Sequence, residues 1–392
     1  MKPIPTSLLG ALLAATLTGV SLPSAARPVA PFPAEVSADA APIALLVDLS
    51  SGQTLFAREA SRRFVPASIT KVMSAYVAFG LIADDHILPA QVVTVPVAIA
   101  EEWGGKGSSM FLERGDRVTI DQLLLGLTSV SANDGAVMLA EAGAGGIDPW
   151  IEAMNAAAAR LDMRDSHFGT PNGWPDEGQT FTTARDLVTL AKAIVTEHPA
   201  LYAHYFGREG YEYNGIAQAN HDPMVGRVEG ADGLKTGFTN QAGYGFLGSA
   251  LRGGRRLALV VAASPSGGER DRAARALVEW GFDAFETQRL FPANTLVGEA
   301  EVQGGLERSV PLVGAHPLRI AVPRGTDPAA VTLSVRYFGP LPAPIAKGDA
   351  VADLEVRVPG QPVHRLPLTA ARDVPEAGLW QRIRNGLVGL VT

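Results

Sequence analysis

The chain has 392 residues, which is enough for two domains with well-buried cores. Hydrophobic residues make up 47% of it and charged residues 19%, a balance typical of globular rather than disordered proteins. A formal net charge of −7 argues against nucleic acid as the main partner, because phosphate binding needs a basic surface, and the absence of cysteine excludes disulfides and thiolate metal sites.

The first 26 residues have the pattern of a secretory signal peptide. Lys2 precedes an apolar run over 7–20, which is shorter than the roughly 18 apolar residues of a membrane-spanning helix. The small residues Ser24 and Ala26 then stand just before the expected cleavage point. We therefore expect an exported protein, with an uncleaved anchor or a buried helix as the alternative. Residues 27–41 are rich in proline and alanine and predict an irregular lead-in.

Residues 42–288 predict a first domain of mixed α and β structure. Its strands are expected in two pairs, and helical patterns occupy the stretch between the pairs. The expected strands cover 44–49, 54–58, 247–251 and 256–263, and the expected helices cover 68–83, 120–143, 148–161, 184–197 and 272–285. Strands at both ends with helices between them favour an α+β fold over one with alternating strands and helices in a parallel sheet.

The remaining chain predicts a small β-rich domain over 289–373 and a last segment over 374–392. Short β-type runs in the β-rich domain are separated by Pro, Gly and Asp. The expected strands cover 309–313, 318–322, 331–337 and 350–358. In the last segment, a helix over 375–392 would place its apolar residues and Trp380 on one narrow stripe, with two arginines outside it. This pattern predicts an amphipathic helix at a membrane surface, and a helix packed on the body is the alternative.

The chemistry of the first domain centres on the motif Ser68-Ile-Thr-Lys71. The chain has no His-Glu-x-x-His and no Gly-x-Ser-x-Gly motif, so zinc hydrolysis and a Ser-His-Asp site lack local sequence support. Pro66 suits a helix start, which would place Ser68 in the first turn with Lys71 over the same face. A lysine can take the proton of a serine hydroxyl if burial or another cation lowers its pKa, whereas arginine cannot.

Lysine is rare in this chain, which adds support for a special role of Lys71. Only six of the 33 Lys and Arg residues are lysines, and Lys71 is the only one of the six with serine three residues before it. A surface pair on one helix is the ordinary alternative for an isolated Ser-x-x-Lys.

Two further motifs follow in the chain. Ser131-Ala-Asn133 stands in a polar break between two helical runs, where it offers a hydroxyl and a carboxamide, or alternatively an ordinary helix cap. Lys235-Thr236-Gly237 stands in a strand-forming pattern. Gly237 would allow a substrate backbone to lie close, and a peptide could add to this strand with its carboxylate at Lys235 and Thr236.

These three motifs, in this order, are those of penicillin-binding proteins and class A β-lactamases. From about residue 44 to the C-terminus the chain resembles low-molecular-mass penicillin-binding proteins of the D-alanyl-D-alanine carboxypeptidase class. Further matching stretches begin at Val47, Lys106, Asp165, Thr183, Gly243, Glu279 and Val374. The resemblance implies an antiparallel sheet with flanking helices and a helical subdomain, followed by a small all-β domain and a membrane-anchoring helix.

The same resemblance implies the function. We expect a serine-type hydrolase that removes the terminal D-alanine from peptidoglycan stem peptides and is acylated by β-lactams, with neither a metal nor another cofactor. We expect it at the periplasmic face of the bacterial inner membrane.

The resemblance also implies roles for the residues around the nucleophile. Ser68 would attack the D-Ala-D-Ala carbonyl and carry the acyl group, and Lys71 would be the general base. Ser131, together with Lys235, would relay the proton to the leaving D-alanine. Asn133 would bind an amide of the acyl donor.

Roles are also implied on the predicted strand beyond Lys235. The backbone N–H groups of Ser68 and Phe238 would bind the oxyanion. Arg270 matches a family position near the terminal carboxylate, with a solvated charge beside two other arginines as the alternative. The family often has His after Lys-Thr-Gly, and this chain has Phe238. Because the contact is made by the backbone, we expect the chemistry to be retained and turnover or substrate range to differ.

Three other functions compete with this interpretation. A class A β-lactamase needs a positioned glutamate, and Glu177 lacks the Glu-x-x-Leu-Asn setting of that family. A D,D-endopeptidase that cuts peptide cross-links would use the same site. A catalytically inactive protein that binds peptidoglycan would not need all three motifs. The β-rich domain and the terminal segment favour the carboxypeptidase.

Overall fold

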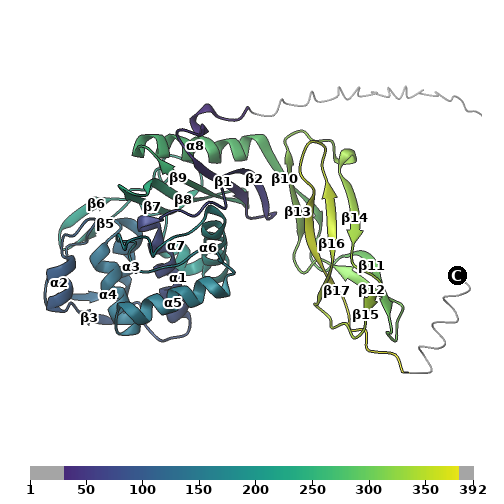
Figure 1. Ribbon diagram of the computed structural model, residues 1–392, viewed down its shortest axis with the longest axis horizontal. Helices are drawn as coiled ribbons and strands as arrows, with labels where there is room; N and C mark the ends of the chain where they lie inside the picture. The colour runs from purple at the N-terminus through teal and green to yellow at the C-terminus, as the bar shows by residue number, and fades with distance from the viewer. Residues whose placement is uncertain (1–30, 379–392) are drawn as a thin grey trace, which may run out of the picture.

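The computed structural model describes residues 31–378. The signal peptide predicted over 1–26, and the helix predicted over 375–392 apart from its first residues, therefore lie outside the described part. Figure 1 shows a broad body of sheet and helices joined to an elongated arm of strands. Within residues 31–378, no helix combines the length and the apolar character needed to cross a membrane.

A five-stranded antiparallel sheet organises the body, with the order β2-β1-β9-β8-β7. The strands are β1 (Ile43–Asp48), β2 (Gln53–Arg58), β7 (Ala231–Thr239), β8 (Gly243–Arg252) and β9 (Arg255–Ser264). The hairpin predicted at the start of the domain is confirmed as β1 and β2. Strand β1 is buried throughout, and β8 and β9 are buried and mainly apolar in their central parts, as expected for strands covered on both faces. Strand β7 lies at the edge, so one side of its backbone has no neighbouring strand.

Helices cover both faces of this sheet (Figure 1). One face carries α8 (Gly267–Ala284), which starts earlier than predicted because the Ser266 side chain caps its first turn at Glu269. The other face carries most of the remaining helices. These are η2 (Ala67–Thr70), α1 (Lys71–Ala83), α2 (Val97–Trp103), α3 (Ile120–Ser129), α4 (Asn133–Ala144), α5 (Ile147–Arg160), α6 (Ala184–Glu197) and α7 (Pro199–Tyr205).

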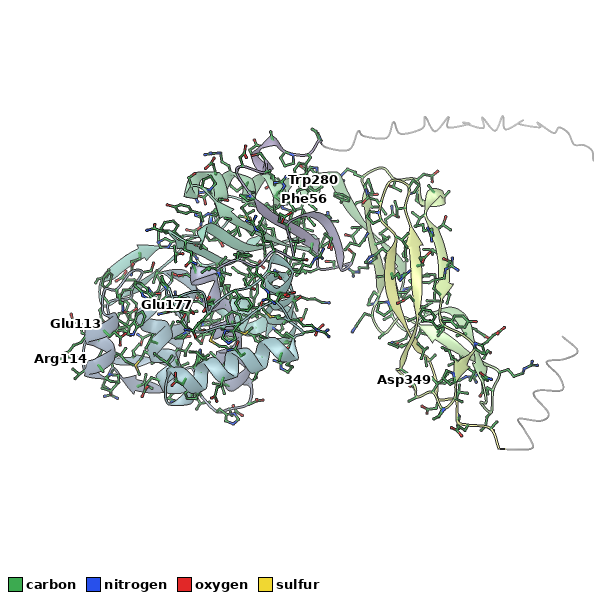
Figure 2. The ribbon with its side chains drawn as sticks, in the orientation of Figure 1. Phe56, Glu113, Arg114, Glu177, Trp280 and Asp349 are labelled. Atoms are coloured by element: carbon green, nitrogen blue, oxygen red, sulfur yellow. The ribbon has the colours of Figure 1, made fainter. Side chains whose placement is uncertain are left out.

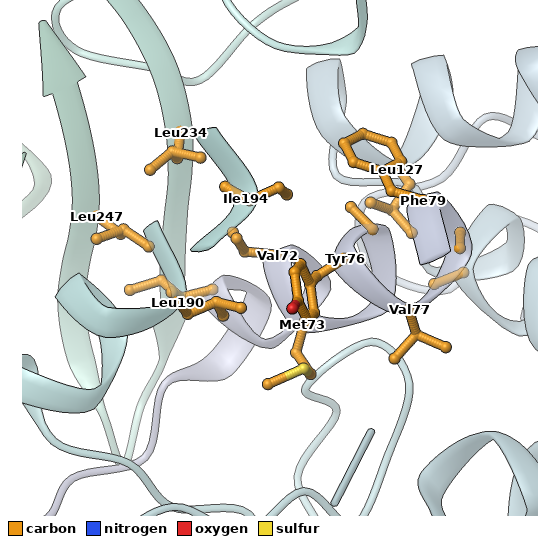
Figure 3. Packing of buried hydrophobic residues seen from close by; sticks show 14 of the residues in the cluster. Val72, Met73, Tyr76, Val77, Phe79, Leu127, Leu190, Ile194, Leu234 and Leu247 are labelled. Carbon is orange, nitrogen blue, oxygen red and sulfur yellow. The ribbon is translucent and has the colours of Figure 1, made fainter. Parts of the chain in front are cut away.

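Helix α1 runs through the centre of this layer and is buried along almost its whole length. Figure 3 shows Val72 facing side chains of α6 and of strands β7 and β8, which belong to the same buried cluster. A helix surrounded in this way holds its first residue in a fixed position, because close packing leaves little room to shift. That first residue is Lys71.

Most predicted elements of the body are present, and the differences lie at their ends. The stretch predicted as a helix over 120–143 forms α3 and α4, separated at the predicted polar break. Thr119 and Gln122 form a reciprocal capping box at the start of α3. The antiparallel pair β3 (Val92–Thr94) with β4 (Arg117–Thr119) and the short hairpin β5 (Gly210–Tyr213) with β6 (Ile216–Ala219) were not predicted, and neither were α2 and α7.

The arm is built from strands, as its sequence predicts. A six-stranded sheet has the order β14-β16-β17-β12-β11-β15, and β10 pairs with β13 beside it. The strands are β10 (Phe285–Phe291), β11 (Leu296–Gln303), β12 (Ser309–Val313), β13 (Leu318–Pro323), β14 (Thr332–Arg336), β15 (Leu341–Pro342), β16 (Ala350–Arg357) and β17 (His364–Ala370). Its core of Val, Leu and Ile side chains is separate from the cores of the body.

The body and the arm are joined by polar contacts at the turn between β1 and β2. The Gln53 side chain exchanges two hydrogen bonds with the backbone of Ala321 on β13. Buried Asp48 accepts hydrogen bonds of 2.8 Å from Arg255 and from Thr287 on β10. Figure 2 shows Phe56 and Trp280 near this junction, where Phe32 of the lead-in contacts both rings.

Candidate active site

Ser68 lies in η2, the single 3₁₀ turn that leads directly into α1. Pro66 precedes the turn and its carbonyl accepts the Ile69 N–H at 3.1 Å. Ala67 has φ 50°, a left-handed conformation that is strained for a residue with a side chain. Since Ala67 and Ile69 are fully buried, the surrounding packing can hold this strained turn in place. The half-buried Ser68 is thereby presented beside the first residue of α1.

Strand β7 crosses directly over this turn at Gly237. A side-chain carbon at residue 237 would lie 2.3 Å from the Pro66 carbonyl oxygen, a distance that no real Cβ contact allows. Glycine is therefore required for packing of the chain against itself, a reason that the sequence did not reveal. This close approach brings Lys235, Thr236 and Phe238 alongside η2.

Lys71 is completely buried and makes three hydrogen bonds through its side-chain nitrogen. Nζ lies 2.9 Å from Ser68 Oγ, 2.7 Å from Asn133 Oδ1 and 2.8 Å from the Asn172 carbonyl oxygen. Burial lowers the pKa of Lys71 well below its ordinary value, and the positive charge of Lys235 lowers it further, against an opposing effect of Asp134. A neutral amine next to a serine hydroxyl has the chemistry of a general base.

The predicted motif at 131–133 lies at the start of α4. Ser131 is buried with φ 63°, and Asn133 is the first residue of the helix. Besides accepting from Lys71, the Asn133 carboxamide donates through Nδ2 to the Lys106 carbonyl at 2.9 Å. The Asn133 backbone N–H donates to the Ser108 carbonyl at 2.8 Å. Asn133 thus orients Lys71, a contact that the sequence did not predict.

Asp134 is a second important residue of this helix start that sequence reasoning missed. It is fully buried and accepts hydrogen bonds from the Ser109 hydroxyl at 2.6 Å and from the backbone N–H groups of Met110 and Leu112 at 3.0 Å. It therefore fixes the segment that follows Lys106 to α4. The available signal was its place at the beginning of a helix, where carboxylates are favoured.

The segment 170–174 supplies the third acceptor of Lys71 and was also missed. Ser74 of α1 donates to the Pro171 carbonyl at 2.6 Å, which holds the segment against the helix. Gly173 has φ 74°, and a side-chain carbon there would lie 1.8 Å from the Ala67 carbonyl oxygen. The contact between backbones at Gly173 and Ala67 keeps the Asn172 carbonyl over Lys71.

Lys235 provides the cationic part of the site on β7. It is 3% exposed, and its Nζ donates to the Thr236 carbonyl at 3.3 Å. Burial lowers the pKa of Lys235 to about 7, with Asp222 acting to raise it and Arg270 to lower it. Arg270, in the first turns of α8, is 8% exposed and donates to the Gly245 carbonyl at 3.3 Å. The alternative of a solvated surface charge is therefore wrong for Arg270.

Phe238 and Thr236 complete the edge of the strand. The Phe238 ring is 48% exposed and stacks on Tyr244 of β8, with ring centroids 4.1 Å apart. Thr236 is 7% exposed. The ring has no titratable group, so this position contributes an apolar surface and a backbone N–H. Glu177, by contrast, is an exposed residue of the body (Figure 2).

Two comparisons of sequence agree with this geometry. Residues 28–266 match the family model for D-alanyl-D-alanine carboxypeptidases, and residues 285–376 match the model for the C-terminal domain of penicillin-binding protein 5. The chain is 33% identical over 368 residues to D-alanyl-D-alanine carboxypeptidase DacD of Escherichia coli, which covers 91% of this chain and 92% of the relative. The DacD enzyme of Salmonella typhimurium is 32% identical over 348 residues, covering 87% and 88%.

A comparison of structures gives the same result. The structure of penicillin-binding protein 5 from Haemophilus influenzae matches with a TM-score of 0.77 at 30% identity, covering 86% of this chain and 98% of that one. The likeness extends over both the body and the arm.

Proposed function

Because this chain belongs to the D-alanyl-D-alanine carboxypeptidase family and is a serine-type hydrolase, we propose that Ser68 carries the acyl group and that Lys71 activates it. The observation that supports these roles best is the 2.9 Å hydrogen bond between Lys71 Nζ and Ser68 Oγ at a fully buried lysine. A buried amine with a lowered pKa can accept a proton at neutral pH.

The reaction would proceed by acylation of Ser68 and then hydrolysis of the acyl group. Lys71 takes the Ser68 proton while Oγ forms a bond to the carbonyl carbon of the penultimate D-alanine. The backbone N–H groups of Ser68 and Phe238 stabilise the negative oxygen that develops. The carbonyl then re-forms as the C–N bond breaks, and the proton held by Lys71 passes through Ser131, with Lys235, to the departing amine of D-alanine. Water later attacks the ester and gives a proton to the neutral Lys71, which returns it to Oγ as the ester bond breaks, so that the shortened peptide leaves and Ser68 is restored.

Substrate binding would use the open edge of β7. A peptide backbone can add to this strand as an extra strand. Its terminal carboxylate would then be held by Lys235 and Thr236, and the buried Arg270 of α8 would contribute positive charge. Both ends of the Asn133 carboxamide already have partners, so an amide of the acyl donor would be bound by the remaining N–H of Nδ2.

We also propose where the enzyme works. Export by residues 1–26, a catalytic domain over 42–288, an all-β domain over 289–373 and attachment by the helix at 375–392 would place it at the periplasmic face of the inner membrane. Its partners there would be peptidoglycan stem peptides, and β-lactams would act as covalent inhibitors. The signal-peptide and terminal-helix patterns of the sequence support this placement.

Mass spectrometry after incubation with penicillin tests the assignment. We expect one covalent adduct, located on Ser68, and no adduct with Ser68→Ala. Release of free D-alanine from a pentapeptide should fall to background in the same variant. Unchanged labelling and release by Ser68→Ala would show the mechanism to be wrong. An assay with cross-linked dimers in parallel separates carboxypeptidase from endopeptidase activity.

A further inference from the structure

The partly exposed side chain of Lys106 lies against two tryptophan rings. Its Nζ lies 4.3 Å from the ring centroid of Trp103 and 5.0 Å from that of Trp174. The two rings also meet edge to face, at 5.6 Å with an interplanar angle of 90°. Trp103 ends α2, whereas Trp174 is the last residue of the segment 170–174, which carries Asn172. Two separate parts of the chain are therefore joined by a single cation.

Hydrogen bonds connect each of these two parts of the chain to Lys71. The Lys106 carbonyl holds Asn133 Nδ2 at 2.9 Å, and Asn133 Oδ1 accepts from Lys71 at 2.7 Å. On the other side, the Trp174 N–H donates to Asn172 Oδ1 at 3.0 Å, and the Asn172 carbonyl accepts from Lys71 at 2.8 Å. Both series of hydrogen bonds therefore end at the Lys71 amine, one through Asn133 and the other through Asn172.

We propose that Trp103, Lys106 and Trp174 form a clasp that holds the two fixed acceptors of Lys71, Asn133 Oδ1 and the Asn172 carbonyl, in position for acylation. The proposal rests on Lys71 acting as the general base of the proposed function. The three clasp residues are positioning residues, because their effect on Ser68 is transmitted through Lys71.

Packing beside the clasp supports a rigid connection. Gly107 follows Lys106 with φ 68°, and a side-chain carbon at this glycine would lie 2.8 Å from Asn133 Nδ2 and 3.1 Å from the Trp174 ring. The loop is therefore pressed against both the carboxamide and the indole. In contrast, the ion pair of Lys106 with Glu102 is long, at 3.9 Å, and the Glu102 side chain is 63% exposed. An exposed pair of this kind contributes little, so the contacts with the rings dominate.

The experiment measures acylation of the full chain by a fluorescent penicillin, with the initial binding constant and the acylation rate constant determined separately. We expect Lys106→Met to lower the acylation rate constant by about 3- to 30-fold with initial binding unchanged. Lys106→Arg should stay within about twofold of the parent, because guanidinium also packs on indole. Trp174→Leu should lose activity to a similar degree, and Trp174→Phe should lose less.

The pH profile distinguishes positioning from a general loss of stability. Opening the clasp admits water near Lys71, which weakens the effect of burial on its pKa, so the acidic limb of the acylation profile should move to higher pH. The charged neighbours that act on Lys71, Lys235 on β7 and Asp134 on α4, are the same in every variant. A thermal midpoint close to that of the parent confirms that each variant is folded.

Exposed Lys192 on α6 offers a matched control, and Lys192→Met should leave both constants unchanged. An acylation rate constant of Lys106→Met within twofold of that of the parent would overturn the clasp proposal. An equal loss of this rate constant in Lys106→Arg would overturn it as well. If Ser68→Ala still abolishes labelling in that case, the proposed function stands and only the clasp fails.

Discussion

The site contains two buried lysines whose surroundings differ. On the base side, formed by Ser68, Lys71, Asn133 and Asn172, the amine makes three close hydrogen bonds. On the edge side, formed by Lys235, Thr236, Phe238 and Arg270, the amine has one hydrogen bond, of 3.3 Å. Both are buried, and burial is the main cause that lowers each pKa, well below its ordinary value for Lys71 and to about 7 for Lys235.

Burial alone does not decide what a lysine does. Burial lowers the pKa of both amines, and the charged neighbour with the larger effect then acts in opposite directions on the two. The positive charge of Lys235 helps to keep Lys71 neutral, while the carboxylate of Asp222 helps Lys235 to keep its proton. One amine is thus suited to accept a proton, and the other to meet an anion near neutral pH.

Replacing Lys71 with arginine would test the base side and should have the largest effect. Arginine keeps a positive charge but cannot release its proton at neutral pH. We expect Lys71→Arg to lower the acylation rate by about 10²- to 10⁴-fold, measured with penicillin and by D-alanine release. The matched control is Lys192→Arg, because Lys192 is an exposed residue of α6. A loss below tenfold would mean that another group is the base.

The pH dependence of KM would test the edge side, with an intermediate effect. Lys235 is protonated below its pKa of about 7 and neutral above it. If this charge holds the terminal carboxylate, KM should be low at acidic pH and rise above pH 7 by up to about tenfold per unit. Lys235→Arg should remove the rise, because its charge persists. The same KM at pH 6 and pH 9 in the parent enzyme would contradict the assignment.

Phe238→His should have the smallest effect. The proposed contact of this residue with substrate is made by its backbone N–H, and its ring packs on Tyr244. We expect kcat/KM to change by less than about threefold, with a new ionisation near pH 6.5 in the profile. A change above tenfold would show that the ring itself contacts the substrate.

The sequence predicted the side chains of the site better than its backbone groups. Ser68 and Lys71 are joined by a hydrogen bond as their motif suggested, and Asn133 lies beside them, although its hydrogen bond with Lys71 was not predicted. These residue types have specific chemistry, and the order of the motifs restricts the fold. Helix boundaries were predicted less well where a cap such as Ser266 sets the first turn.

The backbone groups of the site could not be identified from the sequence in the same way. The Asn172 carbonyl that binds Lys71 is available at any residue, so no residue type identifies it. Gly173 and Gly237 are required by close approaches to Ala67 and Pro66, two residues that are distant from them in the sequence. Such contacts exist only once the chain has folded. The sequence shows that a glycine is present, but it does not show which backbone group the glycine contacts in the folded chain.

The position of β7 in the sheet also has a mechanical consequence. The arm meets the body at the turn between β1 and β2 and through β10, which continues directly from α8. In the order β2-β1-β9-β8-β7, the strand that carries Lys235 is at the opposite edge. A force applied to the far end of the arm would load β1, β2 and α8 first. Strands β9 and β8 would separate β7 from this load, so tension on the arm would reach Arg270 through α8 before it reached Lys235 on β7.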